Sequence, residues 1–326
     1  MSLDTGVTRF FGIEHPVVLA PMAMISGGRL AAAVTSAGGL GLIGGGYGDA
    51  EWLRREFARA EGQTVGCGFI TWSLARQPTL LDEVLQRRPA AIMLSFGELH
   101  PFAERIRAAG VPLIAQAQTL DHARRALDAG ADVVAAQGGE AGGHGMTLRS
   151  TFTLVPDVVD LVAERAPGTP VLAAGGVTDG RGLAAALALG ADGALVGTRF
   201  WASQEALVSP RAHERALTAS GDDTIRTRAY DLVRRLDWPA GYNARALGND
   251  FLDTWHGDED RLAASLPDAV ADYEKAVAAE DFDTAAILVG EGVGLVRQVR
   301  PAADLLADMV DQACRILNRS RAAERP

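Results

Sequence analysis

Residues 129–139 read AGADVVAAQGG, and this stretch contains the pattern that decides the fold. A helix ends in a small residue and glycine, a polar position follows, and an apolar run then leads to another glycine. SAGGLGLIGGG at 36–46 and LGADGALVGTR at 189–199 repeat the pattern. Glycine after a helix adopts a positive φ at little cost. The repeat therefore indicates βα units of a parallel sheet.

The alternation of apolar runs and Ala/Leu/Arg-rich runs extends on both sides of these segments. Candidate strands are 17–20, 40–44, 65–70, 90–95, 112–116, 132–136, 170–174 and 193–197. Candidate helices are 28–37, 50–60, 78–87, 101–109, 120–129, 154–165, 180–189 and 204–219. Eight units in a chain of 326 residues predict an α/β fold of the (β/α)₈ barrel type, which needs about 250 residues.

The expected barrel covers residues 1–219, and the composition changes after it. Residues 220–300 are richer in charge, so we expect a helical insertion or a lid-like subdomain there. Residues 301–326 predict a C-terminal helix that packs on the barrel, because apolar residues recur at roughly helical spacing. These residues are Leu305, Leu306, Met309, Val310 and Ile316.

Charge and hydropathy exclude several classes of protein. The formal charge of −10 argues against a nucleic-acid partner, because phosphate binding needs a basic face. No apolar run approaches the roughly 20 residues of a membrane helix, so we expect no membrane partner. Residues 1–10 lack the apolar core of a signal peptide, which predicts a cytoplasmic protein.

The cysteine and lysine content narrows the chemistry. Cys67 and Cys314 stand far apart, which is typical of buried small hydrophobic residues rather than a metal or redox pair. Lys275 is the only lysine and lies past the barrel. A Schiff-base aldolase, which needs a lysine at a strand end, is therefore excluded.

Few metal ligands follow the candidate strands, where barrel enzymes place their active sites. Glu98 and Glu140 are the carboxylates at these positions, and no histidine pair has metal-ligand spacing. We therefore expect no metal site. The residues favour instead a cofactor that brings its own reactivity.

Glycines after the last two strands predict a phosphate site. Gly175-Gly176 and Gly197-Thr198 follow the strands near which barrels commonly bind phosphate. Their backbone N–H groups and the hydroxyl of Thr198 would be the donors, and Arg199 would add charge.

QGGEAGGHGM at 137–146 is the most specific segment, since its glycines leave room for a flat ring beside the backbone. His144 would be held over that ring, and histidine suits proton transfer near neutral pH. The other histidines have simpler explanations. We expect structural or surface roles for His15, His100, His122 and His213, whereas His256 could close over the site.

Six motifs together resemble the nitronate monooxygenase family, formerly called 2-nitropropane dioxygenases. They are APM at 20–22, AGGLGLIGGG at 37–46, SFG at 95–97, QGGEAGGH at 137–144, AAGGV at 173–177 and GTRF at 197–200. VGEGVGLVR at 289–297 resembles the C-terminal part of the family. The resemblance thus extends from the first candidate strand to beyond the last.

The resemblance implies an FMN enzyme that oxidises alkyl nitronates, or their parent nitroalkanes, with O₂ to a carbonyl compound and nitrite. It implies that His144 is the catalytic residue. The FMN contacts that it implies are Ala20, Pro21, Met22, Gln137, Gly142, Gly143, Gly175, Gly176, Gly197 and Thr198.

Two departures from the family pattern keep alternatives open. Many members have Gly-Val-Asn at the end of the third strand, where this chain has Gly66-Cys67-Gly68. Some place a lysine after the fifth strand, where Gln116 or Gln118 stands here. The alternatives are an FMN- and NAD(P)H-dependent enoyl-thioester reductase and a non-catalytic flavin-binding protein.

Overall fold

The computed structural model describes residues 3–60 and 62–322. Residues 1–2 and 323–326, the outer ends of the expected barrel and C-terminal helix, lie outside the described residues. Cys67 and Cys314 are both buried, as expected. Among the described residues, no helix has the length and hydropathy needed to cross a bilayer.

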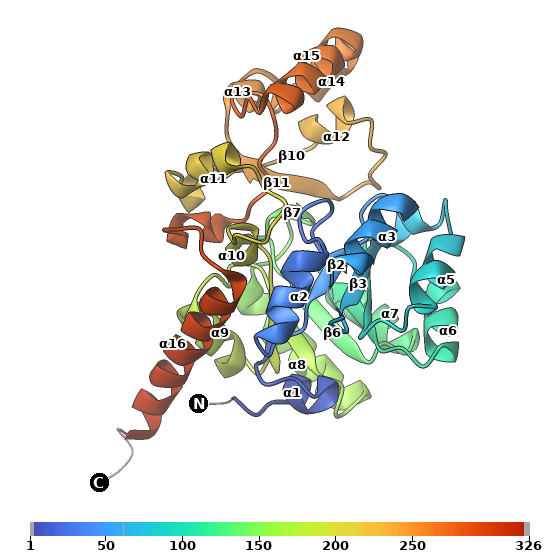
Figure 1. Cartoon of the computed structure of the whole chain (residues 1–326), viewed down its shortest axis with the longest axis vertical. Helices are drawn as coiled ribbons and strands as arrows, with labels where there is room; N and C mark the ends of the chain where they lie inside the picture. The colour runs from blue at the N-terminus through green and yellow to red at the C-terminus, as the bar shows by residue number, and fades with distance from the viewer. Residues whose placement is uncertain (1–2, 61, 323–326) are drawn as a thin grey trace.

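Eight parallel strands form the centre of the molecule, and the predicted (β/α)₈ barrel is confirmed (Figure 1). The strands are β1 Val17–Leu19, β2 Leu42–Gly44, β3 Gly66–Ile70, β4 Ile92–Ser95, β5 Leu113–Ala117, β6 Val133–Gln137, β8 Val171–Ala174 and β9 Gly193–Val196. Their order is β1-β9-β8-β6-β5-β4-β3-β2. An isolated parallel bridge between Val18 and Leu40 joins the two outer strands and closes the barrel.

Alternate residues of the strands fill the barrel interior, as the two-residue period of a strand requires. Val18, Met93, Ile114 and Leu195 belong to this inner cluster. Val7 joins them from helix α1 (Gly6–Phe11), which the sequence analysis did not predict. The interior is therefore a packed core, and ligands can approach only at an end of the barrel.

Helices surround the strands. They are α2 Gly28–Ser36, α3 Ala50–Ala58, α4 Thr71–Leu74, α5 Thr79–Leu85, α6 His100–Ala108, α7 Leu120–Asp128, α8 Thr151–Arg165 and α9 Gly180–Ala188. Helix α16 (Ala302–Ala322) packs against both α9 and α2 (Figure 1). It therefore occupies the place of the eighth barrel helix, for which we had expected residues 204–219. Those residues contain the shorter α11 (Pro210–Leu217), preceded by α10 (Thr198–Trp201).

The segment between α11 and α16 contains strands as well as the expected helices. Its elements are η1 Gly221–Asp223, β10 Thr224–Thr227, α12 Ala229–Val233, β11 Asn243–Leu247, α13 Asp250–Trp255, α14 Glu259–Ala264, α15 Leu266–Ala279 and η2 Glu291–Leu295. Strand β11 pairs antiparallel with β10 and with β7 (Gly143–Gly145), a short strand of the loop after β6. In Figure 1 this added segment lies across the end of the barrel opposite α1.

Candidate active site

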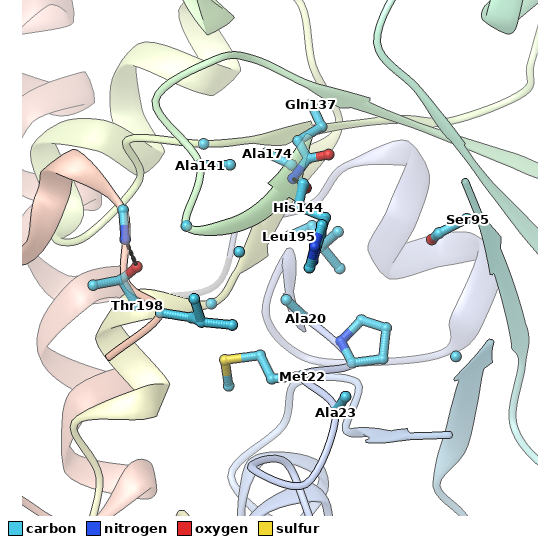
Figure 2. A pocket seen from close by; sticks show the side chains of 18 of the residues that line it. Ala20, Met22, Ala23, Ser95, Gln137, Ala141, His144, Ala174, Leu195 and Thr198 are labelled. Atoms are coloured by element: carbon cyan, nitrogen blue, oxygen red, sulfur yellow. Dashed lines mark hydrogen bonds between the residues drawn. The ribbon is translucent and has the colours of Figure 1, made fainter. Parts of the chain in front are cut away.

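One pocket at the carboxyl ends of the strands contains His144 and every FMN contact that the family resemblance implies (Figure 2). Those lining residues are Ala20, Pro21, Met22, Gln137, Gly142, Gly143, His144, Gly175, Gly176, Gly197 and Thr198. They come from the ends of four strands, β1, β6, β8 and β9, and the barrel brings them together because parallel strands end at the same edge. Figure 2 shows His144, Ala20, Met22 and Thr198 around this hollow.

The loops after β8 and β9 present free hydrogen-bond donors. Within the described residues, the backbone N–H groups of Gly175, Gly176, Gly197 and Thr198 find no acceptor. Gly175 and Gly176 have φ values of 101° and 74°, which glycine adopts readily. Backbone N–H groups arranged in this way bind anions, so the residues present fit the phosphate of a cofactor. The hydroxyl of Thr198 accepts a hydrogen bond from Gly290 N at 2.9 Å and can still donate one.

Arg199 does not contribute to this site as expected. Its guanidinium is buried away from the pocket and donates to the carbonyl oxygen of Gln298 at 2.9 Å. Arg234 is the only cationic residue among the described residues that line the pocket, so at the glycine loops backbone N–H groups would stabilise the anion by hydrogen bonding.

The first departure from the family pattern, Gly66-Cys67-Gly68 at the end of the third strand, has a structural explanation at Gly68. A side chain at this position would collide with the ring of Pro21, so the strand can supply backbone only. Gln116 lines the pocket and donates to Gln137 Oε1 at 2.5 Å. Gln118 donates to the same oxygen from a buried position beside the pocket. The two amides thus fix the side chain of Gln137 at the base of the loop that carries His144.

His144 belongs to β7 and is held from three directions by the added segment. Its backbone pairs with Ala244 of β11. Its Nε2 lies 2.9 Å from Oδ1 of Asp231, and the two side chains are 6% and 4% exposed. Its ring stacks on Trp238 with centroids 3.5 Å apart and planes 6° from parallel. These contacts leave the imidazole little freedom to rotate.

Burial lowers the pKa of His144, because a dry surrounding disfavours the imidazolium. The hydrogen bond and charge of Asp231 oppose this shift, while Arg234 and Arg226 reinforce it. The imidazole is therefore predominantly neutral at neutral pH and can accept a proton.

Arg226 of β10 binds the loop that carries His144. Its guanidinium donates to the carbonyl oxygens of Gly139, Ala141 and Gly145 at 2.9, 3.2 and 3.3 Å. Arg245 of β11 donates to Gly139 as well, at 3.0 Å. Burial lowers the pKa of Arg226 to about 10, so the group stays charged at neutral pH. The glycine-rich loop is thus fixed by arginines far from it in the sequence.

An aromatic cluster connects the added segment to the barrel mouth. Trp238 contacts Tyr47, Trp72 and Phe96 of barrel loops, with ring centroids 6.3, 5.3 and 5.1 Å apart. Tyr242 contacts Phe96 at 5.5 Å. Such a cluster excludes water from the space beside His144, which strengthens electrostatic interactions within it.

The other histidines lie outside the pocket. The ring of His213 is buried, and its Nε2 lies 3.0 Å from the carbonyl oxygen of Trp201. His100 and His122 line a second, neighbouring pocket. His256, which we expected could close over the site, is exposed at the end of α13 and does not line the pocket.

Comparison with known proteins identifies the family of this chain. A profile of the nitronate monooxygenase family matches residues 4–86 and 73–312. The chain is 36% identical to nitronate monooxygenase npaC of Metarhizium robertsii, over 92% of this chain and 91% of that protein. The chain belongs to the nitronate monooxygenase family.

Solved structures show the same fold. FabK from Thermotoga maritima has a TM-score of 0.86 at 30% identity and covers 99% of this chain and 100% of its own. Nitroalkane oxidase from Streptomyces ansochromogenes has a TM-score of 0.78 at 29% identity and covers 95% and 99%. The protein is therefore an oxidoreductase, and the family and these structures indicate a flavin cofactor.

The sequence analysis did not identify three residues of the site, which are Asp231, Trp238 and Arg226. Each lies in the charge-rich segment after residue 220, which has no motif that marks a site. Asp231 is 87 residues from His144, so only the folded chain shows that they are partners.

Proposed function

We propose that this protein binds FMN at the barrel mouth and oxidises alkyl nitronates with O₂ to a carbonyl compound and nitrite. The observation that carries the proposal is the convergence of free backbone donors and one buried imidazole on a single pocket. Membership of the nitronate monooxygenase family supports it. When bound, FMN would supply the electron transfer that no side chain of the pocket can perform.

The residues of the pocket would divide the binding of FMN among them. The N–H groups of Gly175, Gly176, Gly197 and Thr198 would hold the phosphate. Ala20 to Met22 and Gly142-Gly143 would flank the flat ring system. A side chain at Gly143 would meet no atom within 4 Å, so its absence leaves open space at the pocket wall.

His144 would act on the substrate. Its neutral imidazole can accept the proton on the carbon next to a nitro group, which converts a nitroalkane to its nitronate. In its protonated form it would stabilise the negative charge of a nitronate instead. Trp238 and the other aromatic side chains would keep water away during either step.

An enoyl-thioester reductase that uses FMN and NAD(P)H is the second candidate, and the similarity to FabK favours it. Absorbance spectra under anaerobic conditions separate the two. We expect a yellow protein whose flavin absorbance is bleached by the nitronate of nitroethane and returns with O₂, with release of nitrite. Rapid bleaching by NAD(P)H, with no response to nitronates, would replace the proposal by the reductase. A yellow protein inert to both would indicate a non-catalytic flavin-binding protein.

A further inference from the structure

Asp231 is a buried carboxylate whose side-chain partner in the described residues is His144. Its Oδ1 lies 2.9 Å from His144 Nε2, and its Oδ2 is buried without a hydrogen-bond partner. No arginine or lysine of the described chain forms an ion pair with it. A charge buried in this way is costly unless a hydrogen bond compensates it. The hydrogen bond to the imidazole is therefore what compensates the burial of the Asp231 carboxylate.

The chemistry of this contact determines which ring nitrogen carries the proton. An ionised carboxylate can only accept hydrogen bonds, so Nε2 of His144 must donate to it. In the neutral ring Nδ1 then has no proton and keeps its lone pair. Nδ1 forms no hydrogen bond with the described residues, and the stack on Trp238 fixes the plane of the ring. Nδ1 is therefore the nitrogen left for a ligand.

We propose that Asp231 is a positioning residue that holds His144 in the Nε2–H tautomer and thereby makes Nδ1 the proton acceptor for a neutral nitroalkane. This inference rests on the proposed function and adds which nitrogen of His144 accepts the proton and which residue selects it. The C–H bond next to the nitro group breaks, and its electron pair moves to the nitro group to give the nitronate. The proton forms a bond with Nδ1. The carboxylate of Asp231 stabilises the resulting imidazolium, so the step needs no further reactant.

The charged groups around the imidazole are consistent with this role. Asp231 reaches it from α12, Arg234 from the turn after α12, and Arg226 from β10. The phenol of Tyr47, from the loop after β2, contacts Trp238, and burial raises its pKa, so it stays neutral. The two cations together with burial lower the pKa of His144 and leave Nδ1 free to accept a proton at neutral pH.

The tautomer can be measured without any turnover. In full-length protein labelled with ¹⁵N-histidine, the signal lost in His144→Gln identifies this ring among six histidines. Above its pKa we expect Nε2 to be protonated and Nδ1 not. In Asp231→Leu the side chain can neither donate nor accept a hydrogen bond, so the share of the ring protonated on Nδ1 should rise. An unchanged tautomer in Asp231→Leu, or a protonated Nδ1 in the wild type, would overturn the proposal even if no nitro compound is a substrate.

Kinetics with two forms of one substrate provide the second test. Asp231→Asn should lower kcat with neutral nitroethane by about 10²-fold or more, because a neutral amide neither stabilises the imidazolium nor enforces the Nε2–H tautomer. It should lower kcat with the preformed nitronate by less than about 10-fold, because no proton has to be removed. Asp231→Glu should restore part of the loss, and Asp253→Asn, an exposed carboxylate of α13, should change neither rate. Equal losses with both forms would mean that Asp231 has only a structural role. A wild type inert to both forms would refute the proposed function, and the tautomer measurement would still decide the role of Asp231.

Discussion

The barrel mouth and the added segment contribute to the pocket in opposite ways. The barrel contributes backbone, because Gly175, Gly176 and Gly197 expose N–H groups where side chains would fill the space. The added segment contributes side chains, and Asp231 and Trp238 fix the ring of His144. In the proposed function, cofactor binding and proton transfer would therefore depend on separate parts of the chain. Substitutions in one part should therefore affect one property more than the other.

The largest effect on activity is expected from substitution of His144, where the barrel mouth and the added segment meet. His144→Ala should lower kcat/KM with nitroethane by about 10²–10⁴-fold, because the proton acceptor is lost. The flavin content should stay close to that of the wild type, since the ring is not a phosphate ligand. Steady-state oxygen consumption and the flavin spectrum measure the two quantities. Normal turnover in this variant would remove His144 from the mechanism.

The next largest effect is expected at Trp238, which connects the regions. Its side chain is 3% exposed, and Trp238→Ala should lower the free energy of unfolding by about 3–5 kcal/mol. Activity should fall as well, because the imidazole loses its stacking partner. Chemical denaturation provides the measurement. Trp255→Ala is the matched control, since Trp255 is only partly buried and lies outside the pocket. Equal losses of activity in both variants would argue against a specific role for the stack.

The pH dependence tests the added segment in the wild-type protein. Protonation of His144 removes the acceptor, so kcat/KM with nitroethane should fall about 10-fold per pH unit below the pKa. Because burial lowers that pKa, activity should persist below the ordinary histidine value of about 6.5. A pH–rate profile measures this limb. Loss of activity that begins well above pH 6.5 would contradict a lowered pKa of His144.

A smaller effect, confined to the cofactor, is expected at Gly197. A methyl group there would meet only Ala20 Cβ at 3.6 Å and Met22 Sδ at 3.8 Å, so the fold can accept it. Gly197→Ala should weaken FMN binding by about 10-fold, or about 1.4 kcal/mol, by filling the cradle. Fluorescence titration of apoprotein with FMN gives the dissociation constant.

The control for Gly197 is Gly110→Ala, which lies on the barrel surface away from the pocket. Gly110 has a φ of 66°, so alanine should cost about 1–2 kcal/mol of stability and leave FMN binding unchanged. Unchanged FMN affinity in Gly197→Ala would mean that the glycine is a turn residue and not part of a cradle.

The smallest effect is expected at the surface contact between the regions. Arg76 and Asp237 lie 3.2 Å apart, but their side chains are 60% and 88% exposed. Asp237→Asn should change the free energy of unfolding by less than about 1 kcal/mol, because water and salt screen such pairs. A larger loss, measured by denaturation, would show that the ion pair rather than the aromatic cluster joins the regions.

The barrel could be predicted from the sequence because its signals are local. Buried strands appear as short apolar runs, and the glycines that end helices and strands mark the boundaries of each unit. Most residues expected at the mouth lie in the pocket because parallel strands end at one edge, whereas Arg199 and Glu98 do not line it. Helix α1 escaped prediction because its six residues are too few to show a helical period.

The added segment could not be predicted in the same way. Strands β10 (TIRT) and β11 (NARAL) are short and carry arginines, and β11 pairs with the distant β7. Asp231 lies in the sequence RAYDLV, which has the pattern of an ordinary surface helix. Its burial results from the fold of the whole segment around a second apolar core that includes Tyr230 and Phe251.

A crystal structure of the full-length protein reconstituted with FMN tests the central claim most directly. We predict flavin at the barrel mouth, its phosphate on the N–H groups of the loops after β8 and β9, and the imidazole of His144 still bonded to Asp231. Flavin bound elsewhere, or an imidazole turned away from both the flavin and Asp231, would contradict the account.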